Sequence, residues 1–270
     1  SNYSEMRPDV ISMNMLCRIL DNKLIRLRGH KKQYGKVLLG NRYLPQPVEA
    51  YAFWDYYTGA NFSRDYLLGR VASNSVRERV RHAVQSSMLY QGKYRFATKL
   101  TGPGRINYLL SIFPDSKFVH VVRDGRAVTE SLLRVKFWRD KGGFIAPFWE
   151  HGLRSESIND WEQSGKDPLV LVAHQWRRVI ETMYEEASML GDEQYIEVKY
   201  EDFVVSPKEV NCELLLWAGV DCHVDEINKS RSSDQYIDMS LKYQDVFSKD
   251  QLANMNRIMG PMLDQLGYSV

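Results

Sequence analysis

Two short apolar runs stand out from an otherwise mixed pattern of hydrophobic and polar positions. Residues Phe118–Val122 read Phe-Val-His-Val-Val, and residues Tyr195–Lys199 read Tyr-Ile-Glu-Val-Lys. Short runs rich in β-branched residues predict strands. The nearly unbroken apolar character of the first run is typical of a strand buried on both faces of a parallel sheet. A third, weaker strand is predicted over residues 94–98.

The segments around these strands have apolar residues at helical spacing. We predict helices over residues 75–90, 105–112, 125–138, 168–190, 207–217 and 248–267. The loop-rich stretch over about residues 136–167 is interpreted as an aromatic insertion. Strands that alternate with helices predict right-handed crossovers and an α/β sheet with helices on both faces. We expect residues 1–270 to form a single domain.

Composition and charge narrow the kinds of partner. The chain has 270 residues, is 44% hydrophobic and carries a formal net charge of only +2. A nearly balanced charge predicts no general polyanion-binding surface, so no nucleic-acid partner is expected and any anion site must be local. The apolar runs are short and broken by charge, which argues against a membrane span. The sequence predicts no oligomeric state.

The cysteines bear on the compartment. The three cysteines are an odd set without CxxC spacing, and they are Cys17, Cys212 and Cys222. No disulfide framework is expected from them, and a cytoplasmic location is predicted. Three Asn-X-Ser triplets, at Asn2, Asn61 and Asn228, keep the Golgi lumen as the alternative.

The candidate chemistry lies where the predicted strands end. Ligands of parallel α/β sheets bind beyond the carboxyl ends of the strands. The three predicted strands lead into Lys99, Arg123 and Tyr200, and Ser131 follows Arg123 by eight residues. Arg123 also stands just before a predicted helix, whose N-terminus offers N–H groups and a positive field. Cations, an aromatic ring and hydroxyls suit an anionic nucleotide better than a metal.

A metal site is not expected. The six histidines are scattered along the chain without the spacing of metal ligands. His120 lies inside an apolar strand and is interpreted as a satisfied core histidine.

At these residues the chain resembles the PAPS-dependent sulfotransferases, in which 3′-phosphoadenosine-5′-phosphosulfate (PAPS) is the sulfuryl donor. The run FPDSKFVHVVRDGRAVTESLL is similar to the family's 3′-phosphate-binding segment, a strand that ends in Arg with a helical Ser eight residues later. YIEVKYEDF resembles the family's strand-then-YED segment, and the closing Leu266-Gly267-Tyr268 recurs in bacterial-type members. The resemblance covers roughly residues 94–268. It implies a P-loop-like three-layer sandwich with a central parallel sheet flanked by helices.

The resemblance also implies roles for single residues. Arg123 and Ser131 would bind the 3′-phosphate, Tyr200 would help to place the nucleotide, and Lys99 would stabilise the leaving group. The plainer alternatives are an ion pair of Arg123 with Asp124 or Glu130, and ordinary packing for Tyr200.

The general base is predicted from the branches of the family. In some branches it is a Glu in a Pro-rich stretch after the first loop, which here resembles the run LPQPVE that ends at Glu49. In other branches it is a His two residues after the strand-end Lys, and Thr101 at that position excludes this version. Glu49 is therefore the predicted base for transfer to a hydroxyl or amine of a small-molecule, glycan or lipid acceptor. No metal is required, because side-chain cations can neutralise the transferring group.

One departure from the family pattern is serious. The Gly-rich, RSGT-like loop that binds the 5′-phosphosulfate is not in this sequence. We expect that this loop precedes Ser1. The alternative is a non-catalytic nucleotide- or acceptor-binding protein on a sulfotransferase fold. A P-loop kinase is disfavoured because no GxxxxGK[ST] run occurs.

Overall fold

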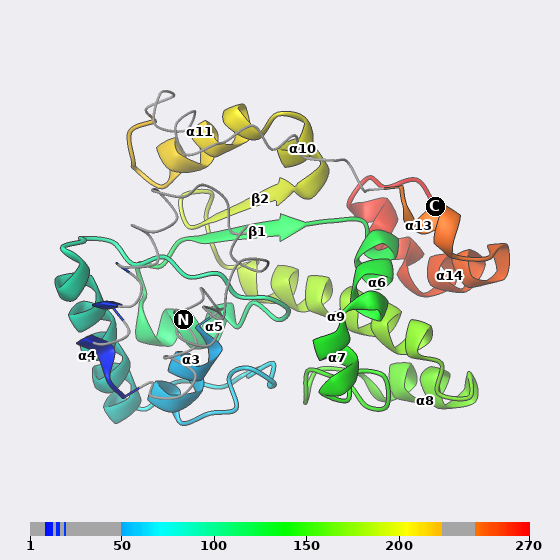
Figure 1. The fold of residues 1–270 in the computed structure, drawn as a ribbon, viewed down its shortest axis with the longest axis horizontal. Helices are drawn as coiled ribbons and strands as arrows, with labels where there is room; N and C mark the ends of the chain where they lie inside the picture. Colours follow the sequence, from blue (N-terminus) through cyan, green and yellow to red (C-terminus); the bar gives the residue numbers. More distant parts are fainter. Residues whose placement is uncertain (1–8, 13–14, 17–18, 20–49, 223–240) are drawn as a thin grey trace, which may run out of the picture. The chain divides into compact units, whose positions relative to one another are not determined.

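The computed structural model describes residues 9–12, 15–16, 19, 50–222 and 241–270 of the chain (Figure 1). They form two compact units. The first contains residues 1–101 with 107–114, and the second contains residues 102–106 with 115–270.

The first unit is helical. It contains α3 (Tyr51–Thr58), α4 (Asn74–Gln91) and all but the first residue of α5 (Ile106–Ile112). The Ser73 hydroxyl accepts a hydrogen bond from the Val76 N–H and caps α4, which therefore begins one residue before the start predicted at residue 75. The predicted strand over residues 94–98 is wrong, because the segment has no regular structure and Tyr94 is 98% exposed.

The second unit is built on two parallel strands, β1 (Phe118–Val122) and β2 (Tyr195–Lys199), which lie side by side and point the same way (Figure 1). The register pairs His120 with Glu197. His120 and Val122 are buried, whereas Val121 on the opposite face is 58% exposed. Among the described residues β1 is therefore buried on one face, and burial of its second face stays a prediction. In the part of the chain that the structure describes, the sheet has two strands, and the core packs against only one of its faces.

Helices supply the rest of the second unit. They are α6 (Gly125–Arg134), α7 (Lys136–Asp140), α8 (Ser155–Gln163), α9 (Pro168–Ala187), α10 (Tyr200–Val205), α11 (Pro207–Trp217), α13 (Tyr243–Val246) and α14 (Lys249–Gln265). The core joins Val122 of β1 to the buried apolar side chains of α9 and α14. Gly125 lets α6 start against this core, because a Cβ there would lie 2.6 Å from the Trp176 ring. The long helix α9 therefore supports the end of β1.

A disulfide corrects the prediction made from the cysteines. Cys212 in α11 is bonded to Cys222, with the two Cα atoms 5.3 Å apart. The chain reverses after α11 at Gly219, whose φ is +69°. That reversal brings Cys222 back beside the helix, a closeness that sequence spacing did not reveal. The expectation that these two cysteines stay reduced is wrong.

Membrane crossing can be examined only in the described segments. None of the helices there combines the length and the apolar character that a transmembrane span requires.

Candidate functional site

The ends of β1 and β2 bring together two of the predicted site residues. Arg123 follows β1 directly and Tyr200 follows β2. The guanidinium carbon of Arg123 lies 4.5 Å from the centroid of the Tyr200 ring. A cation over the face of an aromatic ring is attracted by the ring quadrupole, so the contact restricts where the guanidinium can lie. The contact holds a cation at the carboxyl edge of the sheet.

The turn after Arg123 is fixed by a buried ion pair. The Asp124 carboxylate caps α6 by accepting from the Arg126 N–H at 2.8 Å. The Arg126 Nη2 donates to Asp124 Oδ2 at 2.7 Å, and both side chains are less than a tenth exposed. Burial alone would lower the pKa of the Arg126 guanidinium, but the hydrogen bond to Asp124 outweighs it and raises that pKa.

This cap changes the expected role of the helix. One of the N–H groups at the start of α6 is already bound by Asp124, and the negative charge of that carboxylate opposes the positive field of the helix. Arg126 compensates the charge of Asp124. The cationic character of the strand end therefore depends more on Arg123 and less on the helix than the sequence indicated.

The other predicted site residues are not in described contact with this stack. Ser131 lies half-buried on α6, and its phosphate role stays a prediction. Lys99 is an exposed residue of the first unit, and its role also stays a prediction. Glu49 lies outside the described residues.

Two residues join the strand ends in a way that the sequence did not predict. The Asp124 N–H donates to Glu201 Oε1 at 3.4 Å, and the Tyr268 hydroxyl donates to Glu201 Oε2 at 2.8 Å. Burial, together with the hydrogen bond to Glu201, raises the pKa of the Tyr268 hydroxyl, which therefore stays a donor. The YED run pointed to Glu201, but Tyr268 had only the closing Leu-Gly-Tyr resemblance as a signal. We call Arg123, Asp124, Arg126, Tyr200, Glu201 and Tyr268 the strand-end cluster.

A second polar group joins the middle of the strands. The His120 Nδ1 lies 2.7 Å from the Tyr195 hydroxyl, and the Tyr184 hydroxyl donates to Glu197 Oε2 at 2.7 Å. His120 Nδ1 is also 3.2 Å from Glu197 Oε2. The prediction of a satisfied core histidine is confirmed. We call these four residues the mid-strand network.

The pKa of Glu197 reflects this network. Burial works against the charged carboxylate, but hydrogen bonds from His120 and Tyr184 outweigh it and hold the pKa of Glu197 below its usual range. The hydroxyls respond in the opposite sense, because burial and the nearby Glu197 charge raise the pKa of both Tyr184 and Tyr195.

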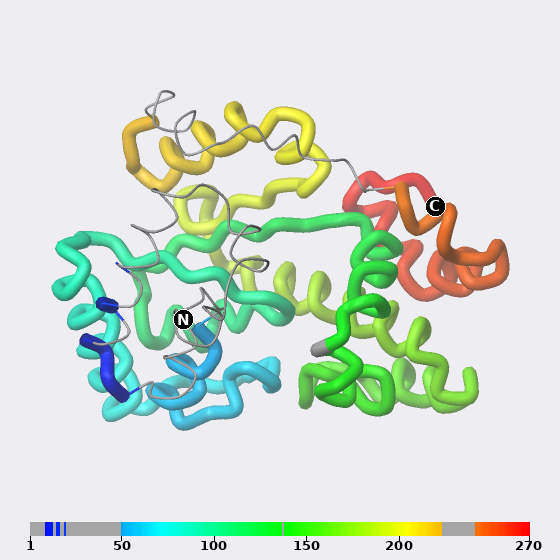
Figure 2. The backbone as a smooth tube through the Cα atoms, in the orientation of Figure 1, coloured from blue at the N-terminus to red at the C-terminus, as the bar shows by residue number. Residues whose placement is uncertain are grey.

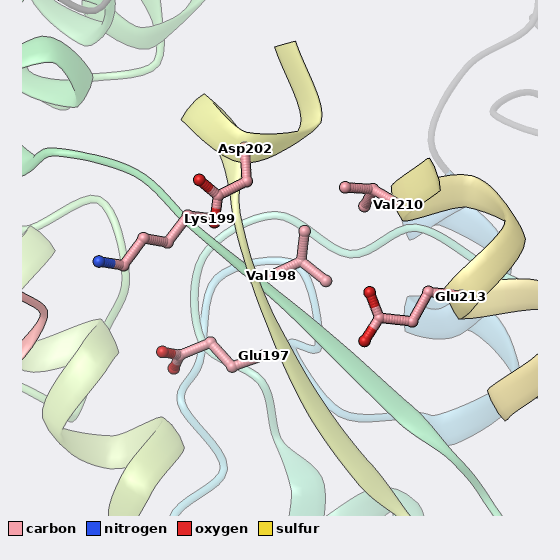
Figure 3. Close-up of a pocket in the computed structure, with 6 residues that line it drawn as sticks. All are labelled: Glu197, Val198, Lys199, Asp202, Val210 and Glu213. Carbon is pink, nitrogen blue, oxygen red and sulfur yellow. The ribbon is translucent and has the colours of Figure 1, made fainter. Parts of the chain in front are cut away.

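A pocket of about 400 Å³ lies along β2 (Figure 3). Its lining residues are Glu197, Val198, Lys199, Asp202, Val210 and Glu213. Glu197 and Lys199 point to one side of β2, and Val198 points to the other side, toward Val210 and Glu213. Three carboxylates against one ammonium group would repel a phosphate. The pocket is therefore a poorer anion site than the strand-end cluster.

The described residues contain no group of three or more His, Cys, Asp or Glu side chains that could hold a metal ion.

Parallel strands whose ends meet in an arginine–tyrosine stack define an α/β protein with a polar cluster at the carboxyl edge of its sheet. The chain belongs to the sulfotransferase family, since the model described as "Sulfotransferase family" matches residues 60–225. The family recognised from the Arg123 and YED segments is thereby confirmed.

Curated relatives carry more specific names. The chain is 25% identical over 179 residues to "Protein-tyrosine sulfotransferase A" of Caenorhabditis elegans, which covers 60% of this chain and 41% of that protein. It is 28% identical over 182 residues to "Protein-tyrosine sulfotransferase" of Drosophila melanogaster, and the alignment covers 60% of this chain and 32% of that protein. For "Protein-tyrosine sulfotransferase 2" of Gallus gallus the identity is 29% over 181 residues, and the alignment covers 60% of this chain and 43% of that protein. The aligned region thus spans less than half the length of these relatives.

Among solved structures, the chain is similar to the "Sulfotransferase Domain from the Curacin Biosynthetic Pathway", with a TM-score of 0.48, 15% identity and coverage of 72% of each chain.

Proposed function

We propose that this protein transfers a sulfuryl group from PAPS to a hydroxyl or amine of an acceptor. The observation that carries the proposal is the stack of Arg123 on Tyr200 at the carboxyl edge of the parallel strands. A fixed guanidinium is well suited to a phosphate, because its planar fork of donors matches the phosphate oxygens. The family resemblance assigns Arg123 to the 3′-phosphate of PAPS and Tyr200 to the placing of the nucleotide.

The proposed chemistry assigns one task to each site residue. Arg123 and Ser131 hold the 3′-phosphate, and Tyr200 orients the nucleotide. Glu49 takes the proton of the acceptor group as the acceptor forms its bond to sulfur and the bond from sulfur to the phosphate oxygen breaks. Lys99 stabilises the negative charge that develops on that phosphate oxygen. PAPS supplies the sulfuryl group and leaves as 3′,5′-adenosine diphosphate.

The wider architecture belongs to the same proposal. We infer a P-loop-like three-layer sandwich that completes the two described parallel strands. The family match over residues 60–225 includes parts of both compact units, which supports a single sulfotransferase-like domain over residues 1–270.

The names of the relatives indicate which acceptor to test first. Three of them are called protein-tyrosine sulfotransferases, so a tyrosine hydroxyl in a peptide precedes small molecules, glycans and lipids as a trial acceptor. A tyrosine hydroxyl also fits the proposed reaction, because it offers one proton to a general base.

The disulfide changes the favoured compartment. The Cys212–Cys222 bond is typical of an oxidising environment, so the Golgi lumen replaces the cytoplasm as our proposed location. Alkylation of the denatured, unreduced protein from source cells, followed by mass spectrometry of the peptides that carry Cys212 and Cys222, should find both cysteines unmodified. Finding both alkylated would return the proposal to the cytoplasm.

Two measurements on the full-length protein test the function. Calorimetry should detect binding of 3′,5′-adenosine diphosphate that is much tighter than binding of 5′-AMP, which lacks the 3′-phosphate. Incubation with ³⁵S-labelled PAPS and tyrosine-containing peptides, with small-molecule hydroxyls and amines in parallel, should yield a labelled product. Absence of nucleotide binding would refute the proposal. Binding without transfer to any acceptor would support the alternative of a non-catalytic nucleotide- or acceptor-binding protein.

A further inference from the structure

The last residues of the chain tie the ends of β1 and β2 together. We propose that Tyr268 is a positioning residue for the anion site, because it holds Glu201 between the two strand ends and thereby fixes Arg123 and Tyr200. The inference rests on the proposed function, since it concerns the same 3′-phosphate site. Figure 2 shows the C-terminal end of the chain beside the start of α6.

The tie to β2 is made through the tyrosine ring and its hydroxyl. The Tyr268 hydroxyl donates to Glu201 Oε2 at 2.8 Å, and the ring centroid lies 5.3 Å from the Lys199 Nζ. Gly267, at φ +73°, turns the chain out of α14 so that Tyr268 can reach these partners. Tyr268 therefore contacts residues on both sides of Tyr200.

The tie to β1 uses both the side chain of Glu201 and the backbone of the tail. The Asp124 N–H donates to Glu201 Oε1 at 3.4 Å. The Arg126 Nη2 donates to the Ser269 carbonyl at 2.8 Å. These contacts form a closed circuit that runs from Asp124 through Glu201, Tyr268, Ser269 and Arg126 back to Asp124.

The circuit includes the backbone next to Arg123 and Tyr200. Arg123 directly precedes Asp124, and Tyr200 directly precedes Glu201. Fixing Asp124 to Glu201 therefore fixes the separation of the two backbones from which Arg123 and Tyr200 extend. Tyr268 occupies one oxygen of the Glu201 carboxylate, and without it that charged oxygen can turn toward a nearby cation and compete with a phosphate for it.

The test compares two tyrosines that make nearly the same hydrogen bond. Tyr268→Phe removes the 2.8 Å bond to Glu201, and Tyr184→Phe removes a 2.7 Å bond to Glu197 in the mid-strand network. Calorimetry on the full-length protein gives the dissociation constants for 3′,5′-adenosine diphosphate and 5′-AMP. We expect Tyr268→Phe to reduce the preference for 3′,5′-adenosine diphosphate about tenfold, while Tyr184→Phe leaves that preference within about twofold.

The outcomes separate this inference from the proposed function. If the unaltered protein does not prefer 3′,5′-adenosine diphosphate, the proposed function itself fails. If the unaltered protein shows the preference and Tyr268→Phe retains it, the positioning role is refuted. Equal weakening of both ligands in Tyr268→Phe would also refute it, because a general loss of structure does not select for the 3′-phosphate. Should Tyr268→Phe fail to fold, Glu201→Gln must show the same selective loss.

Discussion

The mid-strand network and the strand-end cluster both link β1 to β2 and both contain a tyrosine that donates to a glutamate, yet they differ in composition and in origin. The mid-strand network has one carboxylate, Glu197, whose partners His120 and Tyr184 come from β1 and α9. The strand-end cluster has two arginines and two carboxylates, and it recruits Tyr268 from the end of the chain.

This difference separates a structural role from a binding role. In the mid-strand network the half-buried Glu197 carboxylate accepts hydrogen bonds and thereby stabilises the pairing of two strands, but its negative charge repels an anion. At the strand ends the buried charges of Asp124 and Arg126 compensate each other, and Arg123 lies against an aromatic face. The account therefore predicts that changes in the mid-strand network lower stability alone, whereas changes in the strand-end cluster also lower affinity for the nucleotide.

The largest effect on stability is expected from Asp124→Ala. It leaves the buried Arg126 guanidinium without its carboxylate, which costs about 3–5 kcal/mol of the free energy of unfolding. Chemical denaturation measures this cost, and nucleotide affinity should fall as well because the turn after Arg123 loses its cap.

Asp140→Ala is the matched control for Asp124→Ala. The Asp140 carboxylate lies 3.9 Å from Arg139 with both side chains more than half exposed, so its removal should cost at most about 0.5 kcal/mol. If Asp124→Ala is as mild as this control, the buried pair does not organise the strand end.

A smaller loss is expected from Glu197→Ala in the mid-strand network. The Tyr184 hydroxyl and His120 lose their acceptor while they remain largely shielded from water, at a cost of about 2–3 kcal/mol in the free energy of unfolding. Denaturation with the exposed Glu162→Ala as control measures the loss. The preference for 3′,5′-adenosine diphosphate should stay unchanged, and a selective fall in that preference would break the contrast between the two regions.

The smallest effect is a dependence of stability on pH. The pKa of Glu197 lies below its ordinary value of 4.5, so the ionised carboxylate contributes stability above about pH 4.5 that is lost as pH falls through the folded-state pKa. One such group changes the free energy of unfolding by at most about 1.4 kcal/mol per pH unit. Chemical denaturation at several pH values between 6 and 3 gives the free energy of unfolding as a function of pH. That free energy should fall less steeply with pH for Glu197→Gln than for the unaltered protein. An equal slope in both proteins would show that the network does not titrate.

Local signals in the sequence were sufficient to predict most of the described helices and strands. β1, β2 and α11 have the predicted bounds, and the helix predicted from residue 248 is α14, which begins with a capping box of Ser248 and Gln251. The predicted helix over residues 125–138 is interrupted where Val135 turns extended, with ψ at 113°. Residues 94–98 have the composition of a strand, but a strand also requires a partner, and pairing depends on residues far away in the sequence.

The strand-end cluster could be predicted only in part for the same reason. The rule that parallel strands present their carboxyl ends together was sufficient to place Arg123 near Tyr200. The partner of Arg126 at Ser269 and the partner of Glu201 at Tyr268 arise from the path of the chain after α14, which no local pattern encodes. Likewise, the disulfide depended on a reversal at Gly219 that spacing alone did not reveal.

The most direct test of the central claim is the affinity of full-length Arg123→Ala for 3′,5′-adenosine diphosphate, measured by calorimetry beside Arg139→Ala. Arg139 is an arginine of the same unit with a side chain that is 62% exposed. We predict that Arg123→Ala weakens binding about 100-fold and abolishes the preference over 5′-AMP, because it removes the charged donors to the 3′-phosphate. Arg139→Ala should change neither value by more than about twofold. Unchanged binding by Arg123→Ala would contradict the account.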